Sequence, residues 1–213
     1  MAADAYKLYG CPGWGSSLVE CFLALAGVES EFYDVCGFDT PGPARDRLLK
    51  VNALAQVPTL ILPDQMVMTE SAAIALLLSE RFPDASLAPL AGTLQRPLFL
   101  RRLIWIVANI YPTFTYFDYP ERWVASEAES FGERVLNHRK SLWLLFERDL
   151  DSKQWVLDHL SALDVYVAVM SHWRPGRAWF EQYAPRLSAI ARNAADHATL
   201  GPVLLRNFPG AGA

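Results

Sequence analysis

The sequence has no apolar run long enough to cross a membrane. The longest apolar runs, such as Leu54 to Leu62, which contains Pro58, fall short of the ~20 residues that a spanning helix requires. The opening residues MAADAYKLYG also lack the basic stretch followed by an apolar stretch that marks a secretion signal. Apolar residues make up 52% of the chain and charged residues 20%, which is enough to form a sizeable core. We therefore expect a soluble, cytoplasmic protein.

Cysteine, histidine and positive charge are also scarce. The three cysteines, Cys11, Cys21 and Cys36, are too few and too close together to indicate a disulfide framework. The four histidines do not lie at zinc-site spacings from one another or from the cysteines, so no metal is expected. A net charge of −4 argues against nucleic acid as a partner, because phosphate binding requires a basic surface. We expect reduced cysteines in a reducing compartment.

The chain between residues 5 and 82 alternates short strands and helices. Periodicity and turn residues predict strands over residues 5–10, 31–35, 57–62 and 66–69, and helices over 16–26, 44–52 and 70–82. Gly27 is expected to end the first helix. The order βαβαββα is typical of a compact α/β domain built on one small sheet.

The second part of the chain has a helical pattern. Residues 83–92, PDASLAPLAG, carry prolines and no periodicity, which indicates a linker between a domain over 1–82 and a second over 93–213. Apolar residues then recur at three- and four-residue spacing over 95–111, 126–150 and 160–173. Ser161, followed three residues later by Asp164, has the spacing of a capping box, a structural motif.

A Val-Pro pair stands inside a predicted strand. Pro58 cannot donate a hydrogen bond to a neighbouring strand, so it belongs at an edge or a bend, and it is a candidate for the cis isomer. In the simpler interpretation this is an edge strand that closes on a turn. In the functional interpretation the backbone at Val57 faces a ligand.

In order and spacing, these motifs resemble the cytosolic glutathione transferase family, in its bacterial form. The matching segments are NALAQVPTL (52–60), the hairpin 64–69, ESAAI (70–74), FPDASL (82–87) and SALD (161–164). The resemblance implies a thioredoxin-like βαβ-ββα domain that binds glutathione, followed by an all-helical domain that holds the second substrate. It also implies a homodimer and a role in detoxification.

The resemblance assigns the glutathione site residue by residue. Pro58 is cis in that family, and Val57 would offer its N–H and C=O to the cysteinyl part of the tripeptide. Gln56 would add its amide at the glutamyl end, and Glu70 with Ser71 would hold the γ-glutamyl amine and carboxylate. Plain helix capping is the alternative role for Glu70 and Ser71.

The catalytic group is expected in the loop GCPGWGSS (10–17), where a helix N-terminus would stabilise a thiolate. The resemblance favours the Ser16 hydroxyl, with Ser17 second and a backbone donor as a further option. Cys11 is third, because the cysteine of cysteine-type members falls on Gly15 here. Using Cys11 would make the protein a thiol oxidoreductase or lyase.

Aromatic residues indicate where a second substrate would bind. Trp14 in the loop, with Tyr111 and Phe114 in an aromatic-rich helix, would form an apolar wall, although core or dimer packing is an equal alternative. The leading hypothesis is a glutathione transferase that conjugates glutathione to a small apolar electrophile. A non-catalytic binding module with the same fold is the remaining alternative.

Overall fold

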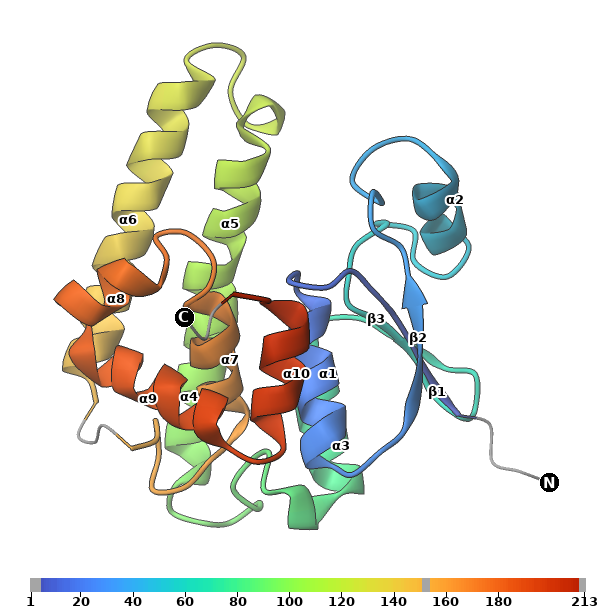
Figure 1. Cartoon of the computed structure of the whole chain (residues 1–213), viewed down its shortest axis with the longest axis vertical. Helices are drawn as coiled ribbons and strands as arrows, with labels where there is room; N and C mark the ends of the chain where they lie inside the picture. Colours follow the sequence, from blue (N-terminus) through green and yellow to red (C-terminus); the bar gives the residue numbers. More distant parts are fainter. Residues whose placement is uncertain (1–4, 151–153, 211–213) are drawn as a thin grey trace. The chain divides into compact units, whose positions relative to one another are not determined.

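The computed structural model describes residues 5–150 and 154–210. The chain divides into two compact units (Figure 1). The sheet unit comprises Met1–Leu90 with Ala194–Ala213, and the helical unit comprises Ala91–Asn193. Among the described residues, no helix has both the length and the apolar character needed to cross a membrane.

The sheet unit contains the predicted order of elements. They are β1 (Tyr6–Gly10), α1 (Ser16–Leu25), β2 (Ser30–Asp34), α2 (Pro43–Leu49), β3 (Thr59–Ile61), β4 (Val67–Met68) and α3 (Ser71–Arg81). The four strands lie in the order β2-β1-β3-β4. β1 runs parallel to β2 and antiparallel to β3, and β4 is antiparallel to β3. The predicted fold class, a small mixed sheet followed by helices, is confirmed.

The core of the sheet unit is formed by apolar side chains of the central strands and of the two helices that follow β1 and β4. Leu8, Phe22, Leu60 and Ile74 have no exposed surface. α1 ends as predicted at Gly27, which has a φ of 64°. The N–H of the next residue, Val28, donates to Leu23 O at 3.0 Å. That bond is typical of a helix ending in a left-handed glycine.

The last helix of the chain also belongs to the sheet unit. α10 (Leu200–Asn207) packs along α1, as Figure 1 shows. The two helices are far apart in sequence but adjacent in this unit. Residues near the C-terminus therefore contribute to the environment of the loop before α1. The division into a glutathione-binding domain over 1–82, a linker over 83–92 and a second-substrate domain over 93–213 stays a prediction.

The helical unit confirms the predicted helical segments. Its helices are α4 (Arg96–Trp105), a π-helical turn (Ile106–Ile110), α5 (Tyr111–Asp118), α6 (Ala128–Arg148), α7 (Ala162–Met170), α8 (Arg177–Tyr183) and the first part of α9 (Pro185–Asp196). Every residue of α7 is buried, which makes this helix the centre of the unit.

The predicted capping box stands at the start of α7. Asp164 accepts hydrogen bonds from the Ser161 N–H at 2.8 Å, the Ser161 hydroxyl at 3.0 Å and the Val156 N–H at 2.7 Å. The Ser161 hydroxyl oxygen in turn accepts from the Leu163 N–H at 3.3 Å. Asp164 has no exposed surface, so water could not replace its carboxylate as the acceptor of these hydrogen bonds.

We predict that Asp164→Ala lowers the free energy of unfolding by ~3 kcal/mol, because it leaves three buried donors without an acceptor. Chemical denaturation measures this loss, and Glu133→Ala, an exposed acid on α6, is the matched control. A loss as small as that of Glu133→Ala would contradict the structural role of Asp164.

The same pair of proteins tests a pH dependence. Burial raises the pKa of the Asp164 carboxyl to about 6, so the folded state binds this proton more tightly than the unfolded chain does. The stabilisation due to this proton is then complete at low pH and is lost as the pH rises toward 6. We expect the stability difference between the wild type and Asp164→Ala to be larger at pH 4 than at pH 7.

Candidate functional site

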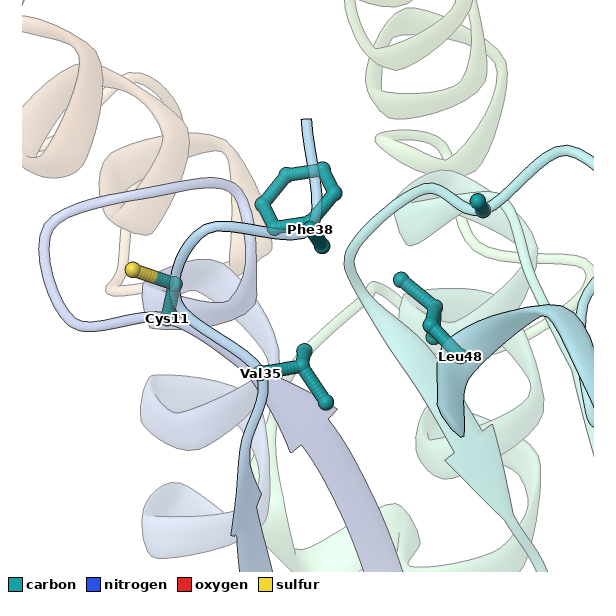
Figure 2. Packing of buried hydrophobic residues seen from close by; sticks show 5 residues of the cluster. Cys11, Val35, Phe38 and Leu48 are labelled. Carbon is teal, nitrogen blue, oxygen red and sulfur yellow. The ribbon is translucent and has the colours of Figure 1, made fainter. Parts of the chain in front are cut away.

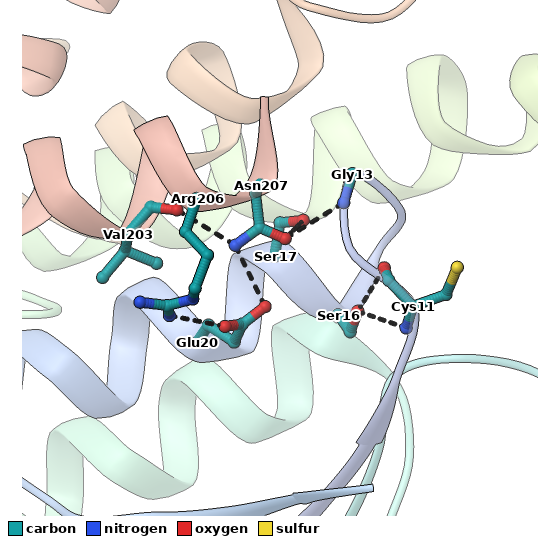
Figure 3. Close-up of polar contacts among 8 residues, drawn as sticks. All are labelled: Cys11, Gly13, Ser16, Ser17, Glu20, Val203, Arg206 and Asn207. Carbon is teal, nitrogen blue, oxygen red and sulfur yellow. Dashed lines mark hydrogen bonds and ion pairs between the residues drawn. The ribbon is translucent and has the colours of Figure 1, made fainter. Parts of the chain in front are cut away.

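Ser16 closes the loop between β1 and α1. Its hydroxyl donates to Cys11 O at 2.9 Å, and its oxygen accepts from the Cys11 N–H at 3.0 Å (Figure 3). Ser16 has no exposed surface. A side chain at Gly10 would place its Cβ 2.5 Å from the Ser16 Cβ, so only glycine permits this packing. Ser16 therefore fixes the geometry of the loop through both backbone polar groups of Cys11.

Ser17 is held by a residue that the sequence analysis did not identify. Its hydroxyl donates to Asn207 Oδ1 at 2.7 Å, and the same oxygen accepts from the Gly13 N–H at 3.0 Å. Asn207 Nδ2 donates to Glu20 Oε1 and to Val203 O, each at 3.0 Å. Figure 3 shows this carboxamide between α10 and the loop. No local sequence pattern links Asn207 to a serine 190 residues away.

Both serine protons are thus engaged within the protein. In contrast, the N–H groups of Gly15 and Ser16, at the start of α1, have no acceptor among the residues that the structure describes. Unpaired amides at a helix N-terminus attract negative charge. These two buried residues therefore carry unpaired backbone donors at the place where the sequence predicts a thiolate.

The expectation that the cysteines are reduced and unpaired is wrong for two of them. Cys11 and Cys36 form a disulfide, and Cys21 is free and buried. The positions of the cysteines in the sequence do not show that Cys11 and Cys36 are adjacent in the fold. β1 and β2 are parallel neighbours with Gly10 opposite Asp34, so the residues that follow the two strands come side by side. As a result, Cys11 is not a free thiol, and any exchange chemistry must begin with this disulfide.

Val57 carries a backbone that the sheet does not use. The Val57–Pro58 bond is cis, as predicted, and β3 begins only at Thr59. Within residues 5–150 and 154–210, nothing pairs with the Val57 N–H or C=O. The preceding carbonyl, Gln56 O, is held by Asn52 Nδ2 at 3.1 Å and by the Thr59 hydroxyl at 2.9 Å. The turn is therefore fixed while the peptide groups of Val57 stay open.

Val57 packs against a buried apolar cluster. The cluster consists of Cys11, Val35, Phe38, Leu48 and Ala55. Figure 2 shows the cluster, with Cys11, Val35, Phe38 and Leu48 labelled. The cluster thus joins the loop after β1, the loop after β2 and the turn before β3.

Glu70 has an unusual backbone conformation at the start of α3. Its φ is 61° and its ψ is 102°, a conformation that a non-glycine residue rarely adopts. Its side chain is exposed, makes no capping hydrogen bond to α3 and has no partner in the described part of the chain. Helix capping by Glu70 is therefore not observed. Ser71 begins α3 and is buried.

The strand register brings these two segments together. β3 and β4 pair with Leu60 opposite Met68, and extending this antiparallel register by two residues on each strand places Pro58 opposite Glu70. The open Val57 backbone and the Glu70 carboxylate therefore lie at the same end of the sheet. Gln56 is exposed beside them.

The proposed second-substrate residues belong to two units. Trp14 is 37% exposed, and its ring contacts Phe38 edge-on at 5.1 Å in the sheet unit. In the helical unit, Tyr111 and Phe114 both contact Trp173, at 5.9 and 5.0 Å. That Trp14, Tyr111 and Phe114 line one pocket stays a prediction.

Packing around Phe114 is dominated by a buried cation. The Arg139 guanidinium lies 3.8 Å from the Phe114 ring centroid and donates to the Thr113 hydroxyl at 2.8 Å.

The helical unit also has a cavity of about 360 Å³ between α5 and α6, whose lining includes Thr113, Tyr116 and Val135. Across the described residues, no group of three or more His, Cys, Asp or Glu side chains could hold a metal ion.

Comparison with known proteins gives a consistent result. Residues 18–81 match the family model described as the N-terminal domain of glutathione S-transferase. The uncharacterized GST-like protein YncG of Escherichia coli (strain K12) is 45% identical over 202 residues, which cover 94% of this chain and 98% of that protein.

Solved structures show the same fold. A glutathione transferase from Methylococcus capsulatus str. Bath is 26% identical with a TM-score of 0.77, and the match covers 94% of this chain and 97% of that one. A glutathione transferase homologue from Sulfitobacter, solved with bound glutathione, is 19% identical with a TM-score of 0.82, covering 93% and 96%. At that identity the second likeness concerns the fold alone.

We predict that Asn207→Ala releases the loop before α1. Removing the Oδ1 acceptor should speed hydrogen exchange of the Gly13 amide by at least about tenfold and lower the free energy of unfolding by ~3 kcal/mol. Hydrogen-exchange mass spectrometry of the peptide that contains Gly13 measures the first effect. Asn137→Ala, an exposed position on α6, is the control. Unchanged exchange at Gly13 would contradict the role assigned to Asn207.

Proposed function

Because the chain belongs to the glutathione S-transferase family, we propose that it binds glutathione in the sheet unit and transfers it to an apolar electrophile. The observation that supports this proposal is that two groups without a hydrogen-bond partner among the described residues lie at the same end of the sheet. One is the backbone of Val57, and the other is the carboxylate of Glu70. Together they suit an extended peptide with a free ammonium group.

Binding would follow the geometry of strand addition. The cysteinyl part of glutathione pairs with the Val57 N–H and C=O as an extra antiparallel strand. The Glu70 carboxylate pairs with the γ-glutamyl ammonium, while Ser71 at the start of α3 faces the γ-glutamyl carboxylate. The exposed Gln56 amide adds a polar contact at the same end. The Sulfitobacter homologue, which has this fold, binds glutathione.

Activation would take place at the start of α1. The thiol sulfur is held near the unpaired N–H groups of Gly15 and Ser16, where the helix dipole favours an anion. The Ser16 hydroxyl donates to the sulfur by exchanging its bond to Cys11 O, and Ser17 is the second choice. Lowering the thiol pKa from about 9 to about 7 raises the thiolate fraction at pH 7 from roughly 1% to about 50%.

The helical unit would supply the electrophile site. Tyr111 and Phe114 would form its apolar wall, and Trp14 of the sheet unit is the third residue predicted for it from the sequence. Bound side by side, thiolate and electrophile react faster because the collision no longer depends on diffusion. A role in detoxification, assembly as a homodimer and placement in the cytoplasm belong to this proposal.

We predict that Glu70→Gln weakens glutathione binding by about 10- to 100-fold, since it removes the charge that pairs with the ammonium group. Isothermal titration calorimetry measures the affinity. Glu80→Gln, an exposed acid at the other end of α3, is the matched control and should bind as the wild type does. Equal affinity of Glu70→Gln and wild type would remove Glu70 from the site.

A second prediction separates the candidate activating groups. Ser16→Ala should raise the pKa that governs the rate of conjugation to chlorodinitrobenzene, while Ser17→Ala, equally buried, should leave it unchanged. The pH–rate profile measures it, with thermal unfolding of each variant as the check on folding. An unchanged pKa in Ser16→Ala would assign activation to the backbone donors. Binding without turnover at any pH would indicate a non-catalytic module.

A further inference from the structure

The two cysteines of the Cys11–Cys36 disulfide differ in their exposure to solvent. Cys11 is 5% exposed and belongs to the buried cluster beneath Val57. Cys36 lies in an exposed turn, two residues after the end of β2. An attacking thiolate reaches the sulfur that solvent reaches. Exposure alone therefore directs attack toward Cys36.

Two guanidinium groups that an anionic thiol could approach lie close to Cys36. Two arginines of α2 reach the backbone on either side of it: Arg45 donates to Phe38 O at 3.2 Å and Arg47 to Asp34 O at 3.5 Å. Asp34 Oδ1 accepts from the Cys36 N–H at 2.8 Å, and the acids Asp39 and Asp46 lie in the same turn and on α2. An exposed cysteine with arginines close by is typical of reactive cysteines.

We propose that Cys36 is a site of thiol–disulfide exchange for a small anionic thiol, with Cys11 as the leaving and resolving group. The incoming thiolate forms a bond to Cys36 Sγ as the Cys11–Cys36 bond breaks, and the electron pair leaves on Cys11 as a thiolate. A second thiolate that attacks the mixed disulfide releases a symmetrical disulfide and leaves Cys36 reduced. Attack by Cys11 on the mixed disulfide restores the starting bond.

Glutathione is the thiol that this position would meet first, and that part of the inference rests on the proposed function. Val57, which would pair with the cysteinyl part of glutathione, packs on the cluster that contains Cys11. The Ser16 hydroxyl oxygen accepts from the Cys11 N–H, and this bond holds the Cys11 backbone in position after the disulfide opens. The exchange would therefore be reversible at a fixed place beside the loop.

Peptide mapping of the wild-type protein tests the direction of attack. Protein purified without reductant is mixed with reduced glutathione, quenched with N-ethylmaleimide and digested. We expect glutathione on the Cys36 peptide and maleimide on the Cys11 peptide. Glutathione mainly on Cys11, no opening of the disulfide, or both cysteines already free in the purified protein would each overturn the proposal.

Single variants give an independent measurement. With oxidised glutathione, Cys11→Ser should acquire a glutathione adduct at Cys36 at least about tenfold faster than Cys36→Ser acquires one at Cys11. Cys21 is the internal control, because it is 1% exposed and burial raises the pKa of its thiol, so it should stay unlabelled. Equal rates in the two variants would contradict the assignment of Cys36.

The choice of thiol separates this proposal from the transferase proposal. Cysteamine has no glutamyl group and carries a positive charge, so it should open the disulfide at Cys36 equally well in Glu70→Gln and in wild type. Arg45→Gln combined with Arg47→Gln should slow exchange with glutathione several-fold without slowing cysteamine, with Arg192→Gln as the control. If cysteamine fails as well, the exchange site is wrong whatever the fate of the glutathione site.

Discussion

The loop before α1 depends on one carboxamide. Asn207 is 5% exposed and makes four hydrogen bonds, to Gly13, Ser17, Glu20 and the Val203 carbonyl. Removing a buried carboxamide lowers the free energy of unfolding by more than the net contribution of its hydrogen bonds, because its former partners stay buried with no acceptor, donor or water in its place. This asymmetry explains why a residue of the last helix governs a loop near the start of the chain. Both lie outside residues 18–81, which match the family model.

The central position of β1 brings the chemistry to one end of the sheet. Its parallel partner β2 delivers Cys36 beside Cys11, and its antiparallel partner β3 delivers the cis Val57–Pro58 turn. β4 adds Glu70 through the register of its pairing with β3. Groups that would bind, activate and exchange a thiol are therefore neighbours for topological reasons. Each of them follows or precedes a strand, where the backbone is free of the sheet's own hydrogen bonds.

Features that depend on a few adjacent residues could be predicted from the sequence. The order of strands and helices, the glycine that ends α1, the cis proline and the Ser161–Asp164 capping box all follow from local patterns and are confirmed. The family was recognised in the same way, from the order of short motifs.

Features that depend on distant residues could not be predicted. The disulfide requires knowing that β1 and β2 are neighbours, and the partner of Ser17 requires knowing that α10 packs on α1. The engagement of the Ser16 hydroxyl by the Cys11 peptide is a matter of loop geometry, which spacing does not encode. The site residues assigned by resemblance stay predictions, although the open backbone of Val57 and the conformation of Glu70 support two of them.

The proposed function depends on whether the start of α1 stabilises a glutathione thiolate. The most direct test is an ultraviolet titration of the thiolate absorbance of glutathione bound to the full chain, from acid to alkaline pH. We expect the bound thiol to ionise with a pKa at least about one below the ~9 of the free thiol. A bound thiol with the pKa of free glutathione would contradict it, and so would a protein that does not bind glutathione.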